Sequence, residues 1–356
     1  MPALTYRQAG LVLRRGPAPS GAGRGAAATE RQVRDLQHDL RKLGYLKSGI
    51  DGRFGSGTER AVKALQHDLL HNTGLGSDAS APVRVVDYNH ARVSQVTGET
   101  DQGLVECLSD ILDDPKFCKL PRAIDPVVEN RRIVSSFAQM TSRSVPIPFV
   151  LAILKQESDL KHFCQPPHGD EDTYIVVGLD ANAGEDYIIT SRGYGAGQYT
   201  LFHHPPRGDE VVDFMLDVSR NLSKAMRELR EKFDRFVAGS TSGTRANDRL
   251  AEIGDVPLRL CKYPPGEPRH LRDCKQCLAG AGKMDIRAGR TPVFEGADIL
   301  FEPTQYYEKA DYNDVPLRKN IECDWPYAMR RYNGSGINSY HYQVRVLKHL
   351  LSLDIH

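Results

Sequence analysis

Residues 33–66 read VRDLQHDLRKLGYLKSGIDGRFGSGTERAVKALQ, and this stretch decides how the N-terminal part of the chain folds. Apolar side chains recur at helical spacing on both sides of a glycine-rich turn, which predicts two amphipathic helices. Thr29 and Gln32 form a capping-box pair before the first helix, and Gly44 stands where glycine commonly ends a helix. Asp51-Gly52 predicts a tight turn, and Thr58 is expected to cap the second helix.

The same residues resemble the peptidoglycan-binding domain found at the ends of bacterial and phage wall enzymes. The matching landmarks are Leu36-Gln37, Leu43-Gly44-Tyr45, Ile50-Asp51-Gly52, Phe54-Gly55, Thr58 and Leu65-Gln66, with Leu13 to Gly16 similar to the opening turn. The resemblance implies a three-helix module that binds wall glycan or stem peptide and performs no chemistry. The implied wall-binding residues are Tyr45, Asp51, Gly52 and Phe54. A helical hairpin used only for packing is the alternative.

Length and charge limit the remaining interpretations. A chain of 356 residues can hold two domains, and we expect the peptidoglycan-binding domain at 1–74, a linker at 75–115 and a second domain at 116–356. The formal net charge of +1 argues against nucleic acid and anionic membranes as partners. The first 28 residues lack the apolar core of a secretory signal. We therefore expect delivery to the periplasm or cell wall by a phage lysis system or an injection apparatus, with an immunity protein as a further partner.

The second domain contains an apolar helix that ends in a glutamate. Pro148 suits the first turn of this helix, and Gln156-Glu157-Ser158 lies near its end. Apolar neighbours and the negative end of the helix dipole favour a protonated carboxyl group at Glu157, as a glycosidase general acid requires. A glutamate at a helix end is otherwise more often a solvated surface residue.

Two further motifs accompany this glutamate. Residues 191–200 read SRGYGAGQYT, and the three glycines allow backbone to approach a sugar closely. Read alone, this segment is only a glycine-rich turn. Downstream, Ala328 and Tyr332-Asn333-Gly334 precede a C-terminal apolar helix.

In this order, the three motifs resemble the lytic transglycosylase and goose-type lysozyme superfamily. The resemblance implies a mainly α protein whose second domain is an α-rich lysozyme-like domain that cleaves the β-1,4 bond between N-acetylmuramic acid and N-acetylglucosamine. Glu157 would protonate the glycosidic oxygen, and Tyr332 would orient Glu157. The residues implied to bind the glycan strand are Ser158, Tyr194, Gly195, Gln198, Tyr199 and Asn333.

Two insertions, at about 164–190 and 240–312, have no counterpart in that superfamily. The first is acidic and offers a second carboxylate that could position water for hydrolysis; the candidates are Asp170, Asp172, Asp180 and Asp186. If the C6 hydroxyl of the sugar attacks instead, one glutamate suffices and an anhydro end forms. We favour the hydrolase, and the transglycosylase stays open. Residues 209–237 predict an amphipathic scaffold helix with Glu228 on its solvated face.

The chain has seven cysteines, an odd number. Cys107 and Cys118 are spaced to close a small loop. Cys261, His270, Cys274 and Cys277 could hold a structural zinc ion. Disulfides that engage Cys323 or Cys164 are the competing interpretation, and we favour them because the expected workplace is oxidising. No cofactor is otherwise required.

Two functions of other classes compete with the glycosidase. The first is a non-catalytic protein that anchors to the wall or has a structural role there. The second is a wall amidase or peptidase, for which only the Cys261/His270/Cys274/Cys277 set could supply zinc.

Overall fold

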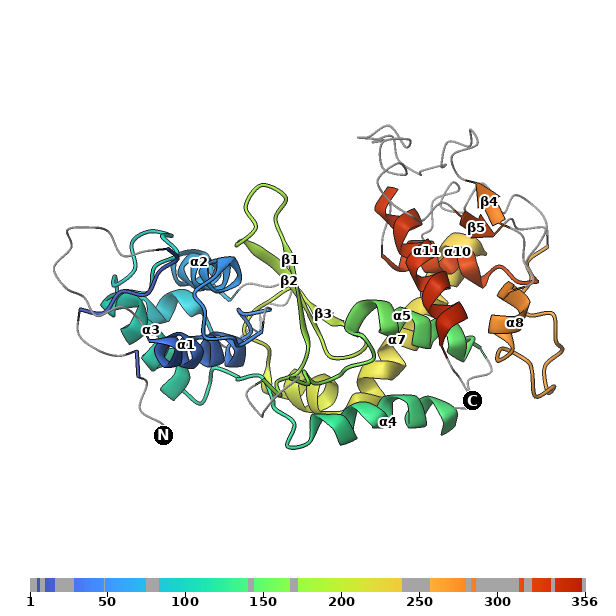
Figure 1. Ribbon diagram of the computed structural model, residues 1–356, viewed down its shortest axis with the longest axis horizontal. Helices are drawn as coiled ribbons and strands as arrows, with labels where there is room; N and C mark the ends of the chain where they lie inside the picture. The colour runs from blue at the N-terminus through green and yellow to red at the C-terminus, as the bar shows by residue number, and fades with distance from the viewer. Residues whose placement is uncertain are drawn as a thin grey trace. The chain divides into compact units, whose positions relative to one another are not determined.

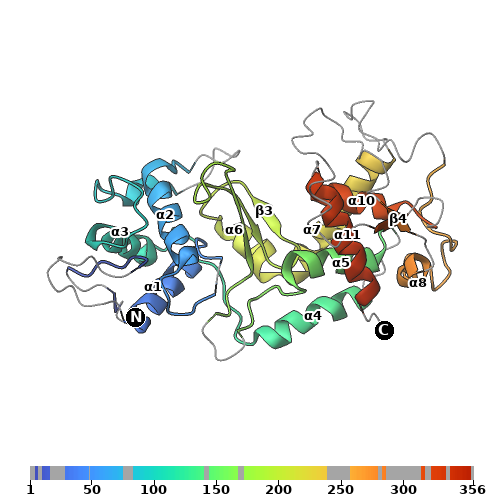
Figure 2. The same cartoon turned by 45° about the horizontal axis from the view of Figure 1, so that its top comes forward.

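The computed structural model describes residues 5–6, 10–16, 29–47, 49–74, 83–139, 144–166, 172–238, 257–279, 283–285, 314–316, 322–333 and 337–353. These residues are mainly helical, which confirms the predicted fold class (Figures 1 and 2). The chain divides into two compact units. The first unit comprises Met1–Arg131 and Lys161–Asn221, and the second comprises Arg132–Leu160 and Leu222–His356.

The secondary-structure elements follow the chain in this order. The helices are α1 (Glu30–Lys42), α2 (Ser56–His71), η1 (Val85–Tyr88), α3 (Gln102–Asp113), α4 (Pro126–Gln139), α5 (Ile147–Ser158), α6 (Gly208–Glu210), η2 (Val211–Leu216), α7 (Val218–Lys232), η3 (Phe233–Val237), α8 (Cys274–Ala279), α10 (Trp325–Tyr332) and α11 (Ile337–Ser352). The strands are β1 (Val177–Ala181), β2 (Ile189–Tyr194), β3 (Tyr199–Leu201), β4 (Lys283–Asp285) and β5 (Asp314–Pro316).

The predicted helical hairpin forms α1 and α2. The capping box is present: the Thr29 hydroxyl accepts the Gln32 amide at 3.3 Å, and the Gln32 side chain accepts the Thr29 amide at 2.8 Å. Gly44 follows α1 with φ +80°, a left-handed conformation that suits glycine. The prediction that Thr58 caps α2 is wrong, because α2 begins at Ser56 with Gly55 at its N-cap.

The interval expected to be a linker differs from that prediction, since residues 83–117 pack against the hairpin. Asp101 caps α3 by accepting the Leu104 amide at 2.9 Å. Leu104, Leu108 and Ile111 on α3 are completely buried in one core with Leu36 and Leu65. Residues 75–82 lie outside the described ranges.

The first unit also contains a three-stranded antiparallel sheet in the order β1-β2-β3. The expected acidic insertion at 164–190 supplies β1 and leads into β2. Gly193 pairs with Gly178 on one side and with Thr200 on the other. The residues from 116 to 131 and from 161 to 221 therefore belong to the same unit as the hairpin, not to a separate C-terminal domain.

In the second unit, α5 packs against α11 and α10. Its apolar residues from Ile147 to Leu154 are buried. The C-cap residue Asp159, with φ 57°, lies in the left-handed region and ends the helix after Ser158. Strands β4 and β5 pair as a short antiparallel ladder. Of the expected insertion at 240–312, residues 257–279 and 283–285 are described. Among all described helices, none has the length and apolar character needed to cross a membrane.

Candidate functional site

The turn of the hairpin is organised by one buried side chain, Gln37. Its Oε1 accepts the amides of Asp51 at 3.0 Å and Gly52 at 2.8 Å. Its Nε2 donates to Asp51 Oδ1 at 2.8 Å and to Thr58 Oγ1 at 2.9 Å. Gly52 has φ +74°, and a Cβ there would lie 2.4 Å from the Glu30 side chain. Glycine is therefore required at this position, and the turn is preorganised.

The predicted wall-binding residues are not equally accessible. Asp51 is exposed and Phe54 is half-buried against the core of the hairpin. Tyr45 is only 1% exposed, and its hydroxyl donates to Asp68 Oδ2 at 2.9 Å. Tyr45 is therefore a core residue that supports the module, while Asp51 and Phe54 face the surface.

A buried ionic network joins the hairpin to the sheet within the first unit. Arg192 of β2 lies 3.2 Å from Asp68 of α2, and both side chains are at most 10% exposed. Arg41 of α1 contacts Asp172 at 3.2 Å. Burial would raise the pKa of Asp68, but its contact with His67 and the charge of Arg192 lower it to about 2. The hairpin is thus fixed to the sheet by paired charges.

A polar pocket lies beside this network, between α2 and the strands. It is lined by His67 and His71 of α2 and by Thr190, Arg192 and Phe202 among other residues. The Phe202 ring is 70% exposed, which is unusual for so large an apolar side chain. An exposed aromatic ring beside polar groups can stack on a sugar. Of the residues in the quoted sequence motifs, only Arg192 lines this pocket.

The glutamine turn between β2 and β3 is held by two buried polar residues that sequence reasoning missed. His162 Nδ1 accepts the Ala196 amide at 3.2 Å, and its Nε2 donates to the Met215 carbonyl at 2.8 Å. Burial lowers the pKa of His162 to about 4, so the ring is neutral. Asn221 Oδ1 accepts the Gly197 amide at 2.7 Å. Gly195 has φ +71°, and a Cβ there would lie 2.4 Å from His162.

The predicted sugar-binding residues of this turn have different environments. Gln198 is half-buried with φ 47°, and its Nε2 donates to the Gly195 carbonyl at 2.8 Å. Its Oε1 lies over Gly178 and Gly193, where a Cβ would collide with it. Tyr199 stacks on Phe214 with ring centroids 3.9 Å apart. Tyr194 is fully buried, and burial raises its pKa to about 12, so it packs inside the unit.

Glu157 lies at the end of α5 in the second unit and is half-buried. The Tyr342 hydroxyl on α11 donates to Glu157 Oε1 at 2.6 Å. Tyr332, the residue predicted to orient Glu157, lies on α10 with its ring nearly parallel to that of Tyr342, at 9° and 6.4 Å between centroids. The Tyr332 hydroxyl is buried and has no hydrogen-bond partner within the described residues. Tyr342 is the tyrosine that the sequence reasoning missed.

Both tyrosines are held in their protonated form. Burial first, and then the negative charges of Glu157 and Glu228, raise the pKa of Tyr332 and of Tyr342 well above the ordinary value. Two neutral phenols therefore lie within electrostatic range of the carboxyl groups of Glu157 on α5 and Glu228 on α7. Glu228 was expected on a solvated face, yet it is half-buried and close enough to act on this site.

The other predicted residues of the second unit make local contacts. The Ser158 hydroxyl donates to the Leu154 carbonyl of its own helix at 2.9 Å and is buried. Asn333 is exposed at the C-cap of α10. The glutamine turn belongs to the first unit and Glu157 to the second.

The four aspartates of the acidic insertion that were candidates for a second carboxylate lie in different environments. Asp170 lies outside the described residues. Asp172 is paired with Arg41, Asp180 accepts the Ser191 hydroxyl at 2.8 Å, and Asp186 contacts Arg60 at 2.7 Å. All three described aspartates are in the first unit, whereas Glu228 shares the unit of Glu157.

The expected disulfides, including one between Cys107 and Cys118, are not formed in this structure, because all seven cysteines are free thiols. Cys107 is buried in the core of the first unit. Cys118 and Cys164 belong to the same unit. The alternative zinc set of Cys261, His270, Cys274 and Cys277 is not grouped around one point. His270 Nδ1 lies 2.7 Å from the Tyr263 carbonyl. Across the described ranges, no three His, Cys, Asp or Glu side chains are grouped to hold a metal ion.

Comparison with known families supports one half of the sequence interpretation. Residues 29–69 match the family model of the peptidoglycan binding domain. The chain therefore carries a peptidoglycan-binding domain, formed by α1, α2 and the Gln37-centred turn between them. No curated protein matches the chain, and no solved structure does.

Proposed function

We propose that the protein is a wall-bound glycosidase that cleaves the bond between N-acetylmuramic acid and N-acetylglucosamine, with Glu157 as the general acid. The hydrogen bond from Tyr342 to Glu157 carries this proposal, because it holds the carboxyl group in one orientation at the end of a buried helix. The peptidoglycan-binding domain supports it by supplying the substrate class. An enzyme of this kind would serve as a phage lysin or an injected antibacterial effector.

The chemistry follows from the two oxygens of Glu157. Oε1 accepts the Tyr342 hydroxyl, so the proton for the glycosidic oxygen is carried on Oε2. Proton transfer lets the bond between C1 of the muramic acid and the leaving oxygen break, through a transition state with positive charge on the sugar ring. The carboxylate that Glu157 becomes on giving up its proton then stabilises that positive charge.

Glu228 favours hydrolysis over intramolecular transfer. A second carboxylate in the same unit can accept a proton from an attacking water, which gives a reducing muramic acid end. Attack by the C6 hydroxyl would give an anhydro end and would not require that carboxylate.

Wall binding is proposed to use two surfaces of the first unit. One is the turn that exposes Asp51 and Phe54, and the other is the polar pocket beside Phe202. The first unit would thus hold the glycan while the second unit cuts it.

Mass spectrometry of purified sacculi after digestion tests the proposal. We expect soluble disaccharide-peptides with reducing muramic acid ends and intact stem peptides. Anhydro ends would leave Glu157 as the acid but replace hydrolysis with transfer. Cut stem peptides would refute the glycosidase in favour of an amidase or peptidase. Sacculi that bind the protein but release nothing would refute it in favour of a wall anchor.

A further inference from the structure

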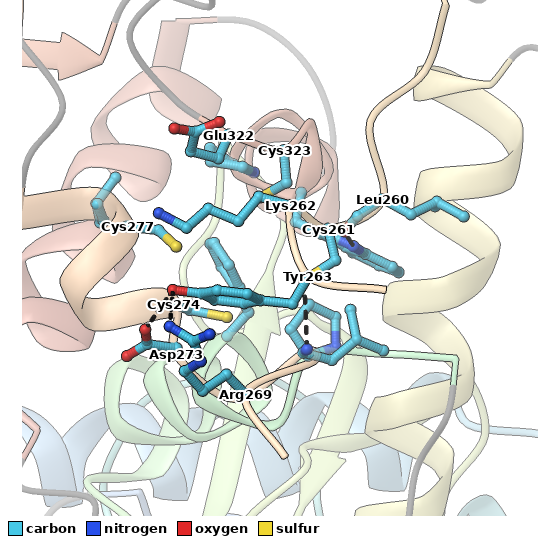
Figure 3. Close-up of a pocket in the computed structure, with 16 residues that line it drawn as sticks. Leu260, Cys261, Lys262, Tyr263, Arg269, Asp273, Cys274, Cys277, Glu322 and Cys323 are labelled. Atoms are coloured by element: carbon cyan, nitrogen blue, oxygen red, sulfur yellow. Dashed lines mark hydrogen bonds between the residues drawn. The ribbon is translucent and has the colours of Figure 1, made fainter. Parts of the chain in front are cut away.

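Four of the seven cysteines line one pocket of the second unit (Figure 3). Cys261 lies in the loop before α8, Cys274 and Cys277 lie on α8, and Cys323 precedes α10. The other three cysteines, Cys107, Cys118 and Cys164, belong to the first unit. The sequence groups Cys261, Cys274 and Cys277 with His270 and leaves Cys323 or Cys164 as a disulfide partner. Of these two, the structure places Cys323 in the pocket.

Paired contacts hold the two sides of this pocket together. The Asp324 amide donates to the Arg259 carbonyl at 2.8 Å, and the Arg259 amide donates to Asp324 Oδ2 at 2.9 Å. The Arg259 guanidinium contacts the same buried carboxylate at 2.8 Å. The Trp325 indole donates to the Leu260 carbonyl at 2.9 Å. These bonds keep the segment around Cys261 beside the segment around Cys323.

We propose that the four thiols of this pocket, Cys261, Cys274, Cys277 and Cys323, form two disulfide bonds when the protein meets an oxidising thiol–disulfide environment. Three of the four lie between residues 261 and 277. Any complete pairing within the pocket therefore joins Cys323 to that segment. The bond ties the start of α10, which carries Tyr332, to the loop and helix that precede it in the chain.

The oxidation proceeds by two thiol–disulfide exchanges. A cysteine thiolate attacks a sulfur of an external disulfide such as oxidised glutathione, and one glutathione thiolate leaves. A second cysteine thiolate attacks the mixed disulfide and displaces the other glutathione. For each bond formed, two protein thiols are oxidised, one glutathione disulfide is reduced to two thiols, and the two protein protons pass to the released thiolates.

The surroundings indicate which thiol attacks first. Burial raises the pKa of Cys323 to about 12 and raises that of Cys274 further, so both stay protonated. Burial also raises the pKa of Cys277, and the positive charge of Lys262 offsets only part of that rise. A cation beside a cysteine favours its thiolate. The first exchange is therefore assigned to Cys261 or Cys277 rather than to Cys274 or Cys323 (Figure 3).

A zinc ion bound by four thiolates is the rival outcome. It would need at least three donors around one point, and no such group exists among the residues that the structure describes. A disulfide needs only two sulfur atoms to meet at a time.

Counting alkylated cysteines in the full chain tests the proposal. The protein is equilibrated with oxidised and reduced glutathione, denatured with a chelator present, and treated with N-ethylmaleimide. We expect three adducts in the intact mass, against seven after reduction, and peptide mapping should link Cys323 to the 261–277 segment. Seven adducts without reduction would overturn the proposal, and one equivalent of zinc in the native protein would then identify a metal site. A bond to Cys107, Cys118 or Cys164 would also overturn it.

Two variants make the result specific. Cys323→Ser should keep one bond within the pocket and give four adducts, whereas the control Cys118→Ser should keep both bonds and give two. Reduction of the wild-type protein should lower Tm by about 10 °C, because the bond closes a long loop. Two adducts in Cys323→Ser, the count expected for the control, would overturn the proposal even if the variant were less stable, because both bonds would then form without Cys323. None of these readouts depends on glycan cleavage.

Discussion

The two units treat their buried polar groups differently. In the first unit, Gln37, His162 and Asn221 each bind backbone groups of segments far away in the sequence, and nearly all of their donors and acceptors are used. In the second unit, Tyr342 donates to Glu157, while the adjacent Tyr332 hydroxyl is buried without a partner among the described residues. Saturated networks hold a structure in place, whereas an unsatisfied buried hydroxyl is expected where a ligand or water completes the site.

Within the first unit, Tyr194 and His204 are exceptions to this rule. Within the ranges that the structure describes, the Tyr194 hydroxyl and both nitrogens of His204 are buried without hydrogen-bond partners, as is Thr100 Oγ1. His204 lies against the rings of Tyr45 and Phe117, with centroids 4.9 and 5.7 Å away. Burial lowers the pKa of His204 well below its ordinary value, so the ring is a neutral packing group.

Replacement of Glu157 in the second unit should have the strongest effect on glycan cleavage. Glu157→Gln keeps an oxygen to accept the Tyr342 hydroxyl but has no acidic proton. Release of soluble fragments from sacculi should fall about a thousandfold. Binding to sacculi should stay within about twofold of the wild type, because the peptidoglycan-binding domain is in the first unit. The exposed Glu231→Gln on α7 is the matched control and should keep full activity. An active Glu157→Gln enzyme would remove the acid from the mechanism.

The next effect breaks the network of the first unit. Arg192→Met leaves the Asp68 carboxylate buried without its cation, and the free energy of unfolding should fall by roughly 3–5 kcal/mol. The control is Arg60→Met, which removes a solvent-exposed pair with Asp186 and should change stability by less than about 0.5 kcal/mol. Urea titration of both variants measures the difference. Equal losses would mean that burial of the first pair has no energetic consequence.

Acid should weaken the first unit through His162. The pKa of this residue is about 4 in the folded chain against an ordinary 6.5, so the unfolded chain binds the proton at higher pH. Its contribution is complete above about pH 6.5 and is lost as the pH falls toward 4, by about 3 kcal/mol. Hydrogen exchange of the Ala196 amide, which donates to His162, provides the local measurement.

The variant His162→Gln separates this effect from other titrations. A neutral amide should remove the His162 part of the pH dependence, while His204 and Asp68 keep theirs. Protection of the Ala196 amide that is independent of pH between 7 and 4 in the wild type would contradict the assignment.

The two tyrosines of the second unit should differ modestly in what they contribute to the rate of glycan cleavage. Tyr342→Phe removes the hydrogen bond to Glu157 and should lower the rate of glycan cleavage about tenfold. Tyr332→Phe removes a hydroxyl that has no hydrogen-bond partner in the described part of the chain and should lower the rate about threefold, through loss of a bound ligand or water. Tyr187→Phe is the control, because it removes a hydroxyl of the first unit that donates to the exposed Glu185. A larger loss in Tyr332→Phe would restore the orienting role to that residue.

Features that depend on residues close together in the chain could be predicted from the sequence. The capping box at Thr29, the requirement for glycine at position 52 and the buried α5 ending in Glu157 follow from local spacing and backbone conformation, and all three are present. Even α3 had a readable signal in the Asp101 cap and its apolar spacing, although turn-rich flanks made the region resemble a linker.

Contacts between side chains far apart in the sequence could be seen only in the tertiary structure. Tyr342 reaches Glu157 because α11 packs on α5, and Cys323 joins the cysteine pocket because Arg259 pairs with Asp324. The hairpin shares a unit with the sheet because Asp68 and Asp172 receive arginines across long sequence separations. Such contacts depend on the direction in which whole elements pack, and spacing along one chain carries no information about that direction.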